Sequence, residues 1–112
     1  MELRRQDYIE FEPAIFVERP GVGALVQSPF VLSGTASVFE GTFQARLVDS
    51  SGRRIVNVTV QASRGAPGRG RFSKEIAFST SAKSGTLIVF DQSMEDGSRR
   101  DEVKIPVTFA AD

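Results

Sequence analysis

One pattern repeats along the chain from Val31 to Asp101: an apolar run of strand length, then a cluster of Gly, Ser, Asp or Pro, then another run. Turn residues recur about every ten positions, and no stretch carries apolar residues at helical spacing for more than about a turn or two. Short strands at this spacing are typical of a small sandwich. The sequence therefore predicts an all-β fold, an immunoglobulin-like antiparallel β-sandwich of about seven to eight strands.

The size of the chain limits it to one such sandwich. Its 112 residues lie within the range of roughly 100–150 that one compact domain usually has. We expect residues 13–112 to form this domain and the charged residues 1–12 to be a leader or linker. Nine Phe and an apolar content of 40% allow a core to form although no Cys is present.

Several runs are expected to form strands or parts of strands. These runs are residues 14–19, 24–27, 30–39, 42–49, 54–62, 72–78, 86–90 and 102–109. Pro20 separates the first two runs, which indicates a strand that switches between sheets. Gly34 inside the third run indicates a bulge or the close approach of another backbone. Pro106 cannot donate a ladder hydrogen bond, so the last strand should have a free edge nearby.

Other local sequences predict features of single strands and turns. Asp49 to Gly52 forms a strong turn signal, because Asp can bond its own backbone two residues on and Gly can take the left-handed conformation. The run TLIVF at 86–90 is continuously apolar and indicates a central strand covered on both faces. Lys74 shares the inward face with Phe72 and Ile76, so it should lie near a sheet end or extend its amine to solvent.

Composition excludes several functions. Without His or Cys, the chain cannot build a Ser-His-Asp or Cys-His catalytic site or a common zinc site. Fourteen basic and fourteen acidic residues cancel, which removes the electrostatic footprint of a nucleic-acid binder or an anionic-membrane binder. No run approaches the roughly 20 apolar residues of a membrane span. We expect no catalytic activity, no cofactor, no metal, no nucleic-acid partner and no direct membrane insertion.

Two acidic arrangements remain to be weighed. Glu40 and Asp91 could divide acid and base roles if the fold brought them together, but nothing in the sequence does so, and acids at turns are far commoner. Residues 91–102 invite comparison with a calcium loop. They depart from the EF-hand pattern because Asp96 occupies the position that needs Gly, and strands rather than helices flank the segment.

Two connections carry polar residues that we expect to bind a partner, since scaffolds commonly display function on loops. The first, SRGAPGRGR at 63–71, has three Gly, one Pro and three Arg and is the most mobile-looking connection in the chain. The second is the turn-rich segment 92–101. The residues predicted to contact a partner are Arg64, Arg69, Arg71, Ser93, Glu95, Asp96 and Arg99.

The order of several short motifs resembles the immunoglobulin-like domain of bacterial spore germination, the module associated with the GerMN domain. The resemblance covers roughly Ala14 to Phe109. The motifs are VQSPFVLS at 26–33, Gly34-Thr35-Ala36, Phe39-Glu40-Gly41, Asp49 to Gly52, the Gly-rich loop before Phe72, and Val89-Phe90-Asp91 followed by Ser93 and Asp96-Gly97-Ser98. It implies an extracytoplasmic module of the bacterial cell envelope, with a binding or adhesive role and no catalytic residue.

The motif residues also have expected structural roles. Phe39 and Phe90 should be core anchors. Gly41, Gly52 and Gly97 should supply backbone conformations that side chains disfavour. Asp91, together with Ser93, should bond turn amides.

The leading hypothesis is a non-enzymatic interaction, adhesion or spacer module of a bacterial cell-envelope protein, whose signal or anchor lies outside this sequence. It would bind a protein or cell-wall partner through end loops or an edge strand, and a homodimer formed by edge pairing is its simplest version.

Two alternatives stay open. A carbohydrate-binding module usually needs exposed Trp or Tyr, and the chain offers only Tyr8 and surface Phe. A small protease inhibitor needs a rigid loop, and the Gly content of residues 63–71 argues against such preorganisation.

Overall fold

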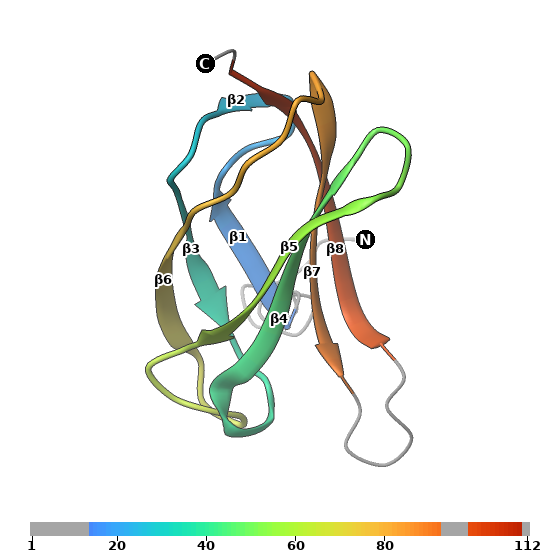
Figure 1. Ribbon diagram of the computed structural model, residues 1–112. Coiled ribbons are helices and arrows are strands. Elements are labelled where there is room, and N and C mark those ends of the chain that lie inside the picture. The colour runs from blue at the N-terminus through green and yellow to red at the C-terminus, as the bar shows by residue number, and fades with distance from the viewer. Residues whose placement is uncertain (1–13, 93–98, 111–112) are drawn as a thin grey trace, which may run out of the picture.

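The computed structural model describes residues 14–92 and 99–110, and these residues form two packed β-sheets (Figure 1). The eight strands of this part are β1 (Ile15–Arg19), β2 (Ala24–Val26), β3 (Phe30–Ala36), β4 (Thr42–Asp49), β5 (Arg54–Gln61), β6 (Gly70–Ile76), β7 (Ser84–Gln92) and β8 (Arg99–Phe109). One sheet has the order β1-β3-β6 and the other β2-β8-β7-β4-β5. The predicted immunoglobulin-like sandwich is confirmed.

The first two strands belong to different sheets. Strand β1 pairs antiparallel with β3, whereas β2 pairs parallel with the end of β8. Pro20 and Gly21 lie between them, where the chain leaves one sheet for the other. The two proline-separated runs are therefore one segment that switches sheets, as the sequence predicted.

Alternation along the strands builds the core between the sheets. In β4, Phe43, Ala45 and Leu47 are each 1% exposed, while the residues between them are half-buried. The ring of Phe43 meets that of Phe72 edge to face at a centroid distance of 4.9 Å. This contact joins β4 of one sheet to β6 of the other, in the geometry that aromatic pairs prefer.

Strand β7 lies between β8 and β4, which is the predicted central position. Leu87 and Val89 face the core, but Phe90 does not join them. Phe90 pairs with Gln44 and therefore shares the outer face of the sheet with it. There Phe90 is 3% exposed, and the Arg46 guanidinium lies 5.4 Å from the centroid of its ring. Phe90 is therefore buried, but on the outer face of the sheet and apart from the core cluster between the sheets.

The third strand is shorter than the predicted run of residues 30–39. It ends at Ala36, and the 3₁₀ turn η1 (Phe39–Gly41) follows. The chain turns there because Glu40 and Gly41 both have positive φ, 56° and 70°, and Gly41 N–H donates to Val38 O at 2.9 Å. Within β3, a Cβ on Gly34 would overlap the carbonyl oxygen of Phe16, so this glycine marks the predicted close approach of a backbone.

Two strands show how the sheet edges are arranged. Strand β6 is an edge of its sheet, and exposed Lys74 lies on its inward face opposite buried Leu32, a placement that discourages edge-to-edge pairing. Strand β8 has β2 beside it only at residues 107–109, and Gly23 N–H donates to Pro106 O at 2.7 Å. Among the described residues, positions 99–105 of β8 have no strand on that side, as Pro106 predicted.

Candidate functional site

An apolar groove of about 390 Å³ lies along one side of the sandwich, between β1 and β8. We call it the side groove. Its lining residues are Ile15, Phe16, Val17, Pro20, Gly21, Val22, Val103, Lys104 and Ile105. Ile15, Pro20 and Ile105 are buried, whereas Phe16 and Val22 are exposed. Apolar side chains of both sheets thus meet at an opening that solvent reaches.

Two strongly exposed apolar residues, Phe16 and Val22, line this groove. Among the described residues, the large apolar side chains with high exposure are Phe16 (43%), Val22 (79%), Leu25 (70%) and Val31 (49%). The first three belong to the segment from β1 to β2, which borders the groove, and Val31 lies on neighbouring β3. Single exposed apolar residues are ordinary, but several together on one surface mark interaction sites.

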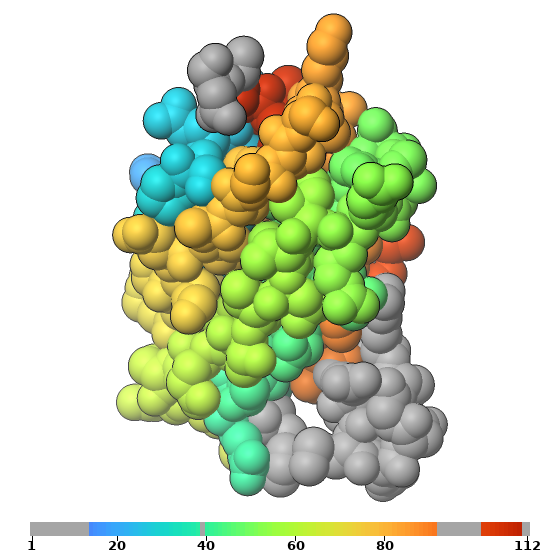
Figure 2. Space-filling view, viewed as in Figure 1, coloured from blue at the N-terminus to red at the C-terminus, as the bar shows by residue number. Residues whose placement is uncertain are grey.

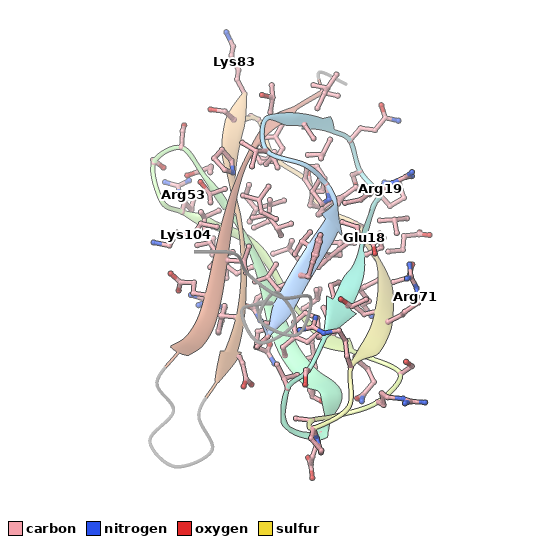
Figure 3. The ribbon with its side chains drawn as sticks, turned by 180° about the vertical axis from the view of Figure 1, so that it is seen from behind. Glu18, Arg19, Arg53, Arg71, Lys83 and Lys104 are labelled. Carbon is pink, nitrogen blue, oxygen red and sulfur yellow. The ribbon has the colours of Figure 1, made fainter. Side chains whose placement is uncertain are left out.

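Two unpaired strand edges flank the side groove. Strand β1 pairs with β3 on one side only, and residues 99–105 of β8 pair with β7 on one side only, within the part of the chain that the structure describes. Figure 3 shows both strands from behind, with Glu18 on β1 and Lys104 on β8. Free N–H and C=O groups beside an apolar surface are the features that bind a polypeptide in extended conformation.

Two of the charged residues on these edges, Glu18 and Lys104, form ion pairs. The Lys104 amine lies 3.4 Å from the Glu102 carboxylate, and the Arg71 guanidinium lies 3.5 Å from that of Glu18. Both pairs are largely exposed, so each stabilises the fold little. The groove between them is thus apolar at its centre and charged at its rim.

Two of the three arginines predicted to bind a partner lie at Thr35, the residue that pairs with Arg71 in the sheet. Arg69 donates to Thr35 Oγ1 at 3.0 Å, and Arg71 pairs with Glu18 across the outer face of the three-stranded sheet. Arg64 is exposed on the connection between β5 and β6. Arg69 and Arg71 therefore fasten this end of the sandwich to β3 and β1.

The connection between β5 and β6, residues 62–69, is tied down rather than loose. Ala66 N–H donates to Val38 O at 2.8 Å, and Ser63 N–H donates to Arg71 O at 2.9 Å. A Cβ on Gly65 would lie 2.8 Å from Gly41 N. Much of this segment is exposed, as expected, and Gly65 permits close backbone packing that the sequence did not predict.

Other predicted residues have the following places. Gly41 and Gly52 have φ of 70° and 86°, and Asp91 is 7% exposed at the end of β7. Ser93, Glu95, Asp96 and Gly97, and the side chains of Phe39 and Arg99, lie outside the described residues. In the described part, no three His, Cys, Asp or Glu side chains are grouped as metal ligands would be.

Sequence reasoning missed the side groove. Residues 14–19 and 24–27 were interpreted only as a switching strand. The available signal was the run Ile15-Phe16-Val17, which is apolar on both faces although β1 has only one face in the core. A large aromatic residue at an outward position of an edge strand needs a further explanation.

Comparisons with known proteins agree with the fold. A family model described as the immunoglobulin-like domain of bacterial spore germination matches residues 14–98. No curated protein and no solved structure matches the chain. Nowhere in the described residues is there a helix with the length and apolarity needed to cross a membrane.

Proposed function

This chain belongs to the immunoglobulin-like domain family of bacterial spore germination, and from this premise we propose that it is a non-catalytic interaction module of a cell-envelope protein. Its partner is a second protein, which inserts an extended segment into the side groove. The observation that carries this proposal is the groove itself, where exposed Phe16 and Val22 lie beside edges of both sheets that no other described strand covers.

An extended segment suits this site for two reasons. Its backbone can continue the hydrogen-bond ladder of β1 or β8, which gives affinity without a particular sequence. Alternate side chains of a strand point to the same face, so every second residue of the partner would enter the groove. Apolar residues at those positions would cover Phe16 and Val22 and release water from them.

The chemistry of the lining favours a polypeptide over a sugar. Lys104 carries the one polar side chain among the lining residues given above. Sugar hydroxyl groups need several amide, carboxylate or hydroxyl partners, and this groove offers few of them. The residues 63–71, in contrast, are engaged in packing and hydrogen bonds, which makes a loop-based protein contact there the weaker hypothesis.

Selection from a phage-displayed library of random peptides would test the proposal. Peptides recovered on the wild-type domain should alternate apolar and polar residues. Their addition should shift the backbone amide NMR signals of β1 and β8 and slow hydrogen exchange at residues 100–104. The Phe16→Ser and Val22→Ser substitutions should each weaken these peptides about tenfold or more.

Val31→Ser supplies the matched control, because Val31 is exposed on β3 outside the groove, and its affinity should equal that of the wild type. Peptides that bind the groove variants as well as the wild type would refute the proposal. So would a dimer in sedimentation velocity that Val22→Ser dissociates, since the occupant would then be a second copy of this chain.

A further inference from the structure

A second concave site lies at the end of the sandwich that carries the turn between β4 and β5. It has a volume of about 430 Å³, and we call it the end pocket. Its lining residues are Asp49, Arg53, Arg54, Ile55, Ser79, Thr80, Ser81 and Ala82. Figure 2 shows the connection between β6 and β7, in gold and orange, running alongside the green β4–β5 hairpin at this end. The side groove lies on a different part of the surface, between β1 and β8.

Two consecutive arginines give the end pocket its charge. Arg53 and Arg54 both line it and both are exposed. No ion pair involves either of them in the described part of the chain. A guanidinium presents several N–H donors in a planar fork that matches the oxygens of phosphate, and it keeps its charge at every physiological pH.

The single acid of the pocket is already engaged. Asp49 Oδ1 accepts hydrogen bonds from Ser51 Oγ at 2.6 Å, Arg53 N–H at 2.9 Å and Ser51 N–H at 3.0 Å. The bond from the Ser51 hydroxyl, followed by that from the Arg53 backbone, lowers the pKa of the Asp49 carboxyl. The carboxylate thereby holds the turn that presents both arginines. Since it balances only one of their two charges, the lining keeps one excess positive charge.

Hydroxyl groups complete the opposite wall. Thr80 Oγ1 accepts the Ala82 N–H at 3.1 Å, which folds the connection around the pocket. Ser79 and Ser81 also belong to the lining, and their hydroxyls make no hydrogen bond with the described residues. Two serines with hydroxyl donors thus line the pocket together with Arg53 and Arg54.

We propose that the end pocket binds a phosphate group. A tetrahedral phosphate has oxygens that point in several directions, so it can accept from arginines on one wall and hydroxyls on the other. A planar carboxylate would satisfy one guanidinium fork and leave the remaining donors unused. The phosphate could be free or could be part of a polyol phosphodiester chain, and both present the same non-bridging oxygens.

Titration with inorganic phosphate, followed by the Arg Nε–Hε and backbone amide NMR signals, would test this site at constant ionic strength. Shifts should concentrate at Arg53, Arg54 and residues 79–82. Arg53→Gln and Arg54→Gln should each weaken binding about tenfold, as expected for the loss of a charge-assisted hydrogen bond. Arg64→Gln is the matched control, because it removes an equal charge from the opposite end of the molecule.

Two further ligands distinguish a polymeric phosphate from free phosphate, and a phosphate from a carboxylate. Tighter binding of a glycerol phosphodiester oligomer than of inorganic phosphate would indicate a polymer ligand, and the reverse order would indicate free phosphate. Acetate at the same concentration should shift these signals much less. Equal effects of phosphate and acetate, or equal loss of binding in the Arg53→Gln and Arg64→Gln variants, would overturn the proposal and leave charge screening as the explanation.

Discussion

The two ends of the sandwich use arginine and glycine in opposite ways. At the end formed by η1 and the β5–β6 connection, Arg69 and Arg71 contact Thr35 and Glu18, and glycines bring backbones together. At the end formed by the β4–β5 turn, Arg53 and Arg54 line an open pocket. A Cβ on Gly52 would meet nothing within 4 Å there, although its φ is 86°.

This difference shows why loop composition is a poor guide to a binding site. Residues 63–71 have more arginine and more glycine than the β4–β5 turn, yet they are engaged in packing and hydrogen bonds at their end of the sandwich. The short turn needs one glycine for a backbone angle and one aspartate for hydrogen bonds, which leaves its arginines available. Whether an arginine can bind a ligand depends on which neighbours its side chain contacts in the folded chain.

The Gly70→Ala substitution should cause the largest loss of stability, and it tests whether backbones pack closely at the end with the β5–β6 connection. A Cβ at this position would overlap Arg64 N and lie 2.9 Å from Arg64 O, and both are backbone atoms that cannot rotate away. We expect a loss of about 3 kcal/mol in the free energy of unfolding, measured by urea denaturation with an unchanged m-value.

Gly21→Ala is the control for that substitution, since nothing lies within 4 Å of its Cβ position and the change should stay within about 0.5 kcal/mol. If Gly70→Ala were as stable as Gly21→Ala, the backbones at this end would not be packed as described.

Substitution of the glycine in the β4–β5 turn should reduce the free energy of unfolding by a smaller amount. Gly52→Ala forces a side chain into the left-handed region at φ 86°, and we expect a loss of about 1–2 kcal/mol. Gly52→Asn should lose less, because Asn tolerates that region. Thermal unfolding of both variants would check this order, and a larger loss with Asn than with Ala would indicate a steric rather than a conformational cause.

These two ends also show what a sequence can and cannot reveal. The strands were predicted because alternation, as in residues 42–49, depends on neighbours along the chain. The Asp49 turn was predicted because its hydrogen bonds span at most four residues. The packing of Gly41 against Gly65 was not predicted, because it joins segments that only the folded chain brings together.

The outer-face position of Phe90 and the missed side groove have related causes. The continuous run TLIVF carries no alternation that assigns a face, and a register irregularity between Val89 and Asp91 alters the pairing with β8. The exposure of Phe16 depends on which strands lie beside β1, which no local pattern encodes. Apolar runs therefore predicted the strands but not which of their side chains stay uncovered.

A smaller effect is expected for the ion pair that occupies Arg71. Its partners are 73% and 43% exposed at the side chain, so water and salt screen the attraction. A double-mutant cycle of Arg71→Ala and Glu18→Ala should give a coupling of about 0.5 kcal/mol or less. A coupling above about 1.5 kcal/mol would mean that this pair, rather than the glycine packing, holds its end of the sandwich.

The smallest expected effect is the pH dependence of folding stability that Asp49 contributes at the end with the β4–β5 turn. The pKa of Asp49 lies below its ordinary value of 3.8 because the Ser51 hydroxyl and the Arg53 amide donate to the carboxylate. The unfolded chain therefore binds a proton more readily than the folded one, so this stabilisation is present above the ordinary pKa. It is lost as the pH falls through the lowered folded-state value.

Asp49→Asn keeps an oxygen that can accept the turn amides but removes the titrating group. At neutral pH the variant should be somewhat less stable than the wild type, because a neutral oxygen accepts these bonds more weakly than a carboxylate. Its stability should then fall less with decreasing pH, so that the two proteins converge below the ordinary pKa. Urea denaturation across the acidic range would measure both slopes, and the other carboxylates, common to both proteins, cancel in the difference. Parallel slopes would show that the Asp49 bonds persist after protonation, and the turn that presents Arg53 and Arg54 would then depend on geometry rather than on charge.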